Sequence, residues 1–183
     1  MWSRNSAVMG KDCEDNVTPN SNTETGQIYD AIQAVAARSK LDHRFILAVV
    51  MQESNGCVRV PTSYSPVPDN ITNPGLMQCF EGNGTCNVKG KTPQNPCPTQ
   101  IIWNMVQEGS MGTLRGDGLV QDMNEAGYTG AQSFYRAARL YNSGSIPQDH
   151  DLGGPGATRC YATDIANRLT GWVLAASKCT LTN

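Results

Sequence analysis

One glutamate stands at the end of an apolar helical stretch, in the segment VVMQESNG. Glu53 follows Val49 by four positions and Val50 by three, so the three residues share one face of a helix. The Asn55-Gly56 pair predicts that the helix ends directly afterwards. Burial and the negative end of the helix dipole should both raise the pKa of the Glu53 carboxyl group. A carboxylic acid that keeps its proton near neutral pH is what general acid catalysis requires.

A structural interpretation of Glu53 is also open. A glutamate in a last helical turn can extend into solvent or pair with an arginine such as Arg59. Spacing alone does not separate this interpretation from the catalytic one, and the neighbouring motifs favour catalysis.

Three short motifs occur in order along the chain: Glu53-Ser54, then Gly75-Leu76-Met77-Gln78, then Leu140-Tyr141-Asn142. Together they resemble the soluble lytic transglycosylase and goose-type lysozyme family (glycoside hydrolase family 23), including secreted fungal proteins, over roughly residues 28–144. The resemblance implies a lysozyme-like α+β fold whose cleft binds β-1,4-linked N-acetylated sugars. It also implies that Glu53 protonates the glycosidic oxygen while positive charge develops on the sugar ring.

The resemblance assigns supporting roles to the other motif residues. Ser54 would orient the acid, and Met77 and Gln78 would line the cleft, with Gln78 bonded to the sugar. Tyr141 would hydrogen-bond to the acid or pack against it, and Asn142 would contact the sugar. A purely structural role for Tyr141 is the alternative, since tyrosines often fill such walls.

The sequence leaves two alternatives for the group that assists Glu53 in the reaction. Lytic transglycosylases need no second carboxylate, because the substrate's own groups assist and an anhydro sugar forms. In goose-type lysozymes, aspartates near the GLMQ segment position a water molecule. Asp69, six residues before Gly75, or Glu81, three residues after Gln78, could hold that water, and Asp69 is the preferred candidate. Turn chemistry at Asp69 is the alternative.

The chain departs from the family pattern in three respects. Cys79-Phe80 follows GLMQ where the goose-type enzymes carry an acidic residue, which puts the water-positioning pair in doubt. Leu140 replaces the alanine that is usual before Tyr-Asn in the family, and this change is expected to narrow the sugar-binding subsite of the cleft at this motif. The net charge of −2 weakens electrostatic capture by an anionic bacterial wall.

Seven cysteines in 183 residues indicate an oxidising compartment, and none forms a C-x-x-C metal pair. Together with three N-x-S/T triplets they predict a secreted protein, and because no leader is visible we expect this chain to be the mature form. The odd number leaves at least one thiol free or paired outside the chain. A helix over residues 161–177 would span about 25 Å, whereas a disulfide tolerates less than about 7 Å between Cα atoms. We therefore expect Cys160 and Cys179 not to pair.

The elements that must position these residues are mainly helices. Helical spacing of apolar residues predicts helices at residues 24–40, 99–108, 131–142 and 161–177, and another from an N-cap at Asp42 to about Ser54. Residues 57–98 are rich in Pro, Gly and Asn and hold four cysteines, so they predict a disulfide-stapled loop region with room for a short hairpin. Residues 145–156 predict a surface loop. We expect one mainly α domain over residues 1–183.

Composition argues against several classes of function. The longest apolar run, residues 45–51, is far shorter than the roughly 20 residues of a membrane-spanning helix. There is no basic run for nucleic acid. The chain has neither an H-E-x-x-H nor a G-x-S-x-G motif, and we expect no metal and no cofactor. We expect a monomer that acts on peptidoglycan, with chitin as the close alternative substrate and a non-catalytic glycan-binding factor as the alternative class.

Overall fold

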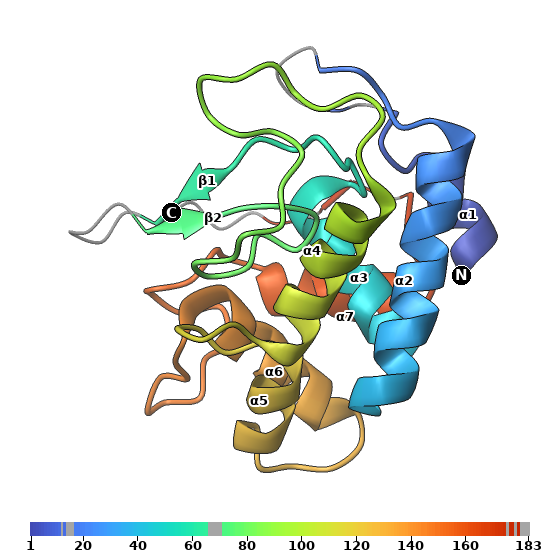
Figure 1. Ribbon diagram of the computed structural model, residues 1–183. Helices are drawn as coiled ribbons and strands as arrows, with labels where there is room; N and C mark the ends of the chain where they lie inside the picture. The colour runs from blue at the N-terminus through green and yellow to red at the C-terminus, as the bar shows by residue number, and fades with distance from the viewer. Residues whose placement is uncertain (12, 14–16, 66–70, 175, 178, 180–183) are drawn as a thin grey trace.

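The structure is a computed structural model that describes residues 1–11, 13, 17–65, 71–174, 176–177 and 179. Within these residues the chain is mainly helical, as the sequence predicts, with two short strands (Figure 1). The helices are α1 (Trp2–Ser6), α2 (Asn22–Ser39), α3 (His43–Ser54), α4 (Thr99–Met111), α5 (Leu119–Glu125), α6 (Ala131–Ser143) and α7 (Tyr161–Leu169). The strands β1 (Ser63–Tyr64) and β2 (Thr72–Asn73) pair antiparallel. No helix in the described part of the chain is long and apolar enough to cross a membrane.

Helix α3 lies at the centre of the molecule, where it contacts α2, α4 and α7 (Figure 1). The Asp42 carboxylate caps the helix by accepting the backbone N–H of Arg44 at 2.8 Å. Its residues from Phe45 to Met51 are at most 3% exposed, as expected of a helix that is apolar all round. Asn55 ends the helix in the left-handed conformation, with a φ of 49°. Both ends of α3 therefore lie where the sequence predicts them.

Three further predicted helices are present as α2, α4 and α6, with ends displaced by at most three residues. Helices α1 and α5 were not predicted, because five and seven residues are too few for an apolar spacing to repeat. Among the described residues, the segment 57–98 contains the β1–β2 hairpin and no helix, and residues 145–156 form a loop. Both features agree with the prediction.

The predicted helix over residues 161–177 is wrong in its second half. Helix α7 ends at Leu169, and Gly171 takes a φ of 100°, a conformation that favours glycine and turns the chain. Trp172 is 63% exposed, so it does not continue the buried stripe of the helix. The chain then runs back beside α7, where the Ser177 hydroxyl donates to the Asp164 carboxylate at 2.7 Å.

This reversal corrects the expectation about Cys160 and Cys179, which form a disulfide with their Cα atoms 5.7 Å apart. The expectation assumed a straight helix between the two cysteines, and the turn after Leu169 removes that separation. The other disulfides join Cys13 to Cys57 and Cys86 to Cys97. The loop region 57–98 is thus linked by disulfides both within itself and to the N-terminal segment.

Cys79 is the remaining cysteine, and it is free and only 2% exposed. We expect the folded protein to resist alkylation by iodoacetamide, because a thiolate cannot form readily at this buried site. Burial raises the pKa of the Cys79 thiol to about 12, with a further contribution from Glu108. After unfolding without reductant the chain should take one label, and after reduction seven. Mass spectrometry of the three samples checks this, and three labels without reduction would mean that one disulfide is absent.

A buried ion pair between Arg59 and Glu24 joins the loop region to the first turn of α2. The Arg59 Nη1 atom lies 2.5 Å from Glu24 Oε1, and Nη2 lies 3.0 Å from Oε2. Burial raises the pKa of Glu24, but hydrogen bonds from Arg59 and from the N–H groups of Ser21 and Cys97 outweigh burial and lower the pKa to about 2. Because Arg59 is committed to Glu24, it is not a partner of Glu53.

Candidate functional site

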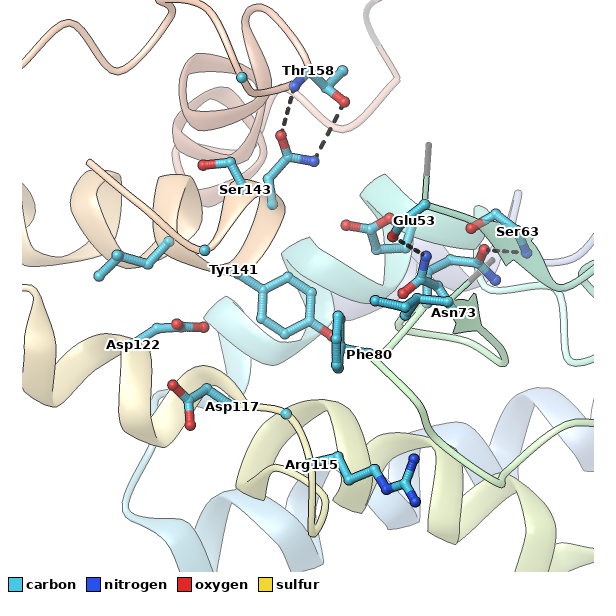
Figure 2. Close-up of a pocket in the computed structure, with 18 of the residues that line it drawn as sticks. Glu53, Ser63, Asn73, Phe80, Arg115, Asp117, Asp122, Tyr141, Ser143 and Thr158 are labelled. Carbon is cyan, nitrogen blue, oxygen red and sulfur yellow. Dashed lines mark hydrogen bonds between the residues drawn. The ribbon is translucent and has the colours of Figure 1, made fainter. Parts of the chain in front are cut away.

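A cavity of about 610 Å³ opens between the hairpin and helices α5 and α6, within the size range of small-ligand sites. Its wall is built by the end of α3, the hairpin with the turn that follows it, the α4–α5 connection, α5 and the end of α6. Figure 2 shows the side chains of these segments around one common space. Residues that are far apart in the sequence therefore share one site.

Glu53 lies in this wall and is partly buried. Burial raises the pKa of its carboxyl group, a hydrogen bond from Tyr161 lowers it, and the net result is a pKa of about 7. A substantial fraction of Glu53 is therefore protonated at neutral pH. This electrostatic state agrees with the expectation from its place on the apolar helix face.

The hydrogen-bond partner of Glu53 is Tyr161, the first residue of α7, whose hydroxyl donates to Glu53 Oε1. Tyr161 is 3% exposed, and burial raises its pKa well above the ordinary tyrosine value, so it stays a proton donor in the hydrogen bond. Sequence reasoning missed this residue. The available signal was that Tyr161 and Ile165 share one face of a predicted helix, which indicates an inward side chain but not its partner.

Tyr141, which the resemblance places near the acid, donates its hydroxyl to the Met77 carbonyl oxygen at 2.7 Å instead. It lines the cavity, and it ties α6 to the turn that contains Met77. The hydrogen bond expected of Tyr141 to Glu53 is therefore made by a different tyrosine. Burial raises the pKa of Tyr141 well above its ordinary value, with a smaller contribution from Glu53.

Replacing Tyr161 with Phe removes the hydroxyl and keeps the ring. Because the hydrogen bond from Tyr161 lowers the pKa of Glu53, we expect the pKa of Glu53 to rise above about 7 in the variant. Carbon-13 NMR titration of the glutamate carboxyl groups measures this change without requiring activity. Tyr141→Phe is the matched control, since its hydroxyl bonds to a carbonyl group, and it should move the pKa of Glu53 less. An unchanged Glu53 titration in Tyr161→Phe would contradict the assignment.

Ser54 does not bond to the Glu53 carboxyl group. Its hydroxyl lies 2.8 Å from the Leu76 carbonyl oxygen and 2.9 Å from that of Val50, and it accepts the N–H of Gly56 at 3.1 Å. Ser54 thus joins the end of α3 to the turn that contains Leu76. It positions the helix end that carries the acid, and does not orient the carboxyl group directly.

Met77 and Gln78 differ in their placement. Met77 is fully buried in the core and does not line the cavity. Gln78 lines the cavity, and its side chain is held by three hydrogen bonds, to the Ser63 N–H and to the carbonyl oxygens of Pro61 and Gly75. Gln78 therefore fixes the hairpin against the following turn.

The remaining predicted site residues are divided between the cavity and its surroundings. Asn142 lines the cavity and holds the opposite loop, since its Oδ1 accepts the Thr158 N–H at 2.7 Å. Glu81 is not part of the cavity wall and pairs with Arg115 at 3.1 Å. Asp69 lies outside the described residues.

A second carboxyl group of the cavity, Asp122 on α5, was not predicted. It is 5% exposed, and its Oδ2 atom has no hydrogen-bond partner among the described residues. Burial, followed by repulsion from Asp117 and Glu125, raises the pKa of Asp122 to about 8. Figure 2 shows Asp122 and Glu53 on opposite sides of Tyr141. No motif marked Asp122, because it lies on a helix too short to be recognised from the sequence.

Comparisons of the chain with protein-family models, with curated proteins and with solved structures found no match.

Proposed function

We propose that this protein is a secreted, lysozyme-like glycosidase that cleaves β-1,4 bonds of peptidoglycan, with Glu53 as the general acid. The observation that carries the proposal is a carboxyl group in the wall of a cavity of about 610 Å³, with a pKa raised by burial to about 7. A general acid is most efficient when its pKa lies near the pH at which it works. The three motifs that resemble the transglycosylase and goose-type lysozyme family support the same assignment.

In the proposed reaction, Glu53 transfers its proton to the glycosidic oxygen as the bond to the sugar ring breaks. The glutamate becomes a carboxylate in a partly buried site, and the Tyr161 hydroxyl, already bonded to Oε1, stabilises that charge. The oxygen of water or of a group of the substrate itself then bonds to the ring cation, and the proton that this oxygen loses passes to the Glu53 carboxylate or to solvent. Reaction with water is hydrolysis, and reaction with the substrate's own group forms an anhydro sugar.

The rest of the wall suits a sugar polymer. Hydroxyl and amide groups line it at Ser63, Asn73, Asn142 and Thr158, and they can exchange hydrogen bonds with sugar hydroxyls. The Phe80 ring is 38% exposed in the same wall and offers an apolar surface to a sugar ring. The three disulfides are compatible with an extracellular protein.

Incubation with purified peptidoglycan and, separately, with N-acetylglucosamine hexamers tests the proposal. We expect soluble fragments from peptidoglycan, and their masses distinguish hydrolysis from formation of an anhydro product, which is lighter by one water. Cleavage of the hexamer alone would move the assignment to chitin-type polymers. Binding without cleavage of either substrate would favour a non-catalytic glycan-binding protein and would refute the enzymatic proposal.

A further inference from the structure

Three carboxyl groups from one short segment line the cavity. Asp117 belongs to the α4–α5 connection, and Asp122 and Glu125 lie three residues apart on α5. Figure 2 shows the Asp117 and Asp122 side chains near each other on the side of Tyr141 away from Glu53. We call these three residues the acidic wall.

Asp122 is the buried member of the acidic wall. It is 5% exposed, lines the cavity, and keeps an Oδ2 atom without a hydrogen-bond partner in the described structure. A buried carboxyl group with an unpartnered oxygen is unfavourable, so a ligand that brings a donor to the Asp122 carboxyl group from the cavity gains affinity from it. The unpartnered oxygen is the feature that marks a binding position.

Nearby cations do not neutralise the acidic wall. Arg115 lines the cavity but pairs with Glu81 at 3.1 Å. On α6, which packs against α5, Arg136 donates to the Ala126 carbonyl oxygen and Arg139 donates to carbonyl oxygens of the loop that follows α6. The charged residue of α4 is Glu108, which accepts backbone N–H groups. Within the described part of the chain, Asp122 therefore lies near the carboxyl groups of Asp117 and Glu125, and no cation bonds to it.

The expected ligand group is an organic cation. Among the described residues, no group of three or more acidic, histidine or cysteine side chains is arranged to hold a metal ion. An ammonium group has three donors and a positive charge, so it can bond to the free oxygen and offset the repulsion among the carboxylates. A neutral acetamido group supplies only one donor and no charge.

We propose that the acidic wall binds the free 2-ammonium group of a glucosamine unit, so that the preferred substrate is a β-1,4-linked hexosamine polymer that is partly de-N-acetylated. This inference rests on the proposed function, because the acidic wall and Glu53 line one cavity and a polymer bound by the first presents its glycosidic bond to the second. A net negative charge of the chain is favourable for such a polymer.

Binding of the ammonium group is also expected to release a proton from Asp122. The pKa of free Asp122 is about 8, so at pH 6 its carboxyl group holds a proton. A bound cation favours the carboxylate and lowers this pKa, and the proton is released to the buffer. A neutral, acetylated ligand leaves the proton on Asp122.

Isothermal titration calorimetry of the Glu53→Gln variant at pH 6 tests the proposal with two ligands, a glucosamine hexamer and an N-acetylglucosamine hexamer. We expect the glucosamine hexamer to bind about tenfold more tightly, as an ion pair with a buried carboxylate allows. Its apparent enthalpy should depend on the ionisation enthalpy of the buffer. Equal or tighter binding of the acetylated hexamer would overturn the proposal and leave the proposed function standing. If neither hexamer binds, and peptidoglycan stays intact after incubation with the wild-type protein, both are overturned.

Substitutions in the acidic wall test which residue causes the preference for the glucosamine hexamer. Asp122→Asn should remove the preference for the glucosamine hexamer and the proton release, and keep the binding of the acetylated hexamer. Asp117→Asn, at an exposed position of the acidic wall, should reduce the preference and serves as a second variant should Asp122→Asn fold poorly. Asp30→Asn is the matched control, since Asp30 is exposed on α2 and does not line the cavity. An unchanged preference in both wall variants would contradict the proposal.

A further comparison separates the two sources of an ammonium group in a bacterial wall, the sugar and the peptide. Peptidoglycan before and after chemical de-N-acetylation carries the same peptides, so a gain in binding after treatment that is lost in Asp122→Asn assigns the group to the sugar. Dependence on Asp122 that is equally strong for untreated peptidoglycan would assign the group to the peptide and refute the sugar assignment.

Discussion

Replacing Glu53 with Gln is expected to lower the rate of glycan cleavage by roughly 10²- to 10⁴-fold, the usual contribution of a general acid. The amide has the shape of the carboxyl group and keeps an oxygen that can accept the Tyr161 hydroxyl, but it has no acidic proton to transfer. Measured kcat/KM on soluble glycan fragments checks the loss. Asp30→Asn, a similar change at an exposed position on α2, should leave the rate unchanged.

The pH dependence of the wild-type reaction follows from the same group. Cleavage requires protonated Glu53, whose pKa is about 7, so kcat/KM should fall as the pH rises above about 7. A rate that stays level up to pH 9, or a Glu53→Gln variant that cleaves as fast as the wild type, would contradict the assignment of the acid.

Stability measurements distinguish loss of the acid from loss of the fold. The folded-state pKa of Glu53, about 7, lies above its ordinary value of 4.5, so the folded protein loses stability as the pH rises through this interval. At pH 8 this loss amounts to roughly 1 to 3 kcal/mol. Glu53→Gln carries no such penalty and should unfold at a higher urea concentration than the wild type at pH 8, with little difference at pH 4.

Glu24→Gln is expected to reduce the free energy of unfolding by about 3 to 5 kcal/mol, because it leaves the Arg59 guanidinium buried without its counter-charge. Both side chains are at most 2% exposed, and the remaining Arg59 partners are carbonyl oxygens such as those of Thr18 and Pro19. The glutamine oxygen can still accept the Ser21 N–H, so the helix cap is preserved. Its NH2 group replaces the oxygen that accepts Arg59 Nη1 and the Cys97 N–H, so the change removes the charge together with these hydrogen bonds.

Urea denaturation at pH 7 measures this effect, and the double variant Glu24→Leu/Arg59→Met is the matched control. Removing both charges should cost less stability than removing one, since no unpaired ion stays in the core.

The contribution of Glu24 to stability also depends on pH in a defined direction. The pKa of Glu24 is lowered from 4.5 to about 2, so its contribution is present above about pH 4.5 and disappears as the pH falls towards 2. A Glu24→Gln variant as stable as the wild type at pH 7 would refute the structural role of the pair.

Local signals in the sequence were sufficient for the helix that carries the candidate acid. An N-cap aspartate, an unbroken apolar run and an Asn-Gly stop lie within 15 residues of each other, and they determine where α3 begins, ends and is buried. Position on that helix then determined that Glu53 would be pushed towards its protonated form. These predictions succeeded because each depends on neighbours along the chain.

Tertiary structure alone decided which groups surround the acid. The tyrosine bonded to Glu53 is 108 residues away in sequence, and the tyrosine of the recognised motif bonds elsewhere. Asp122 enters the cavity on a helix too short to show a period, and Cys160 reaches Cys179 because α7 ends at Leu169 and does not continue as a straight helix. Such contacts depend on how distant segments pack in three dimensions, and periodicity along one segment carries no information about them.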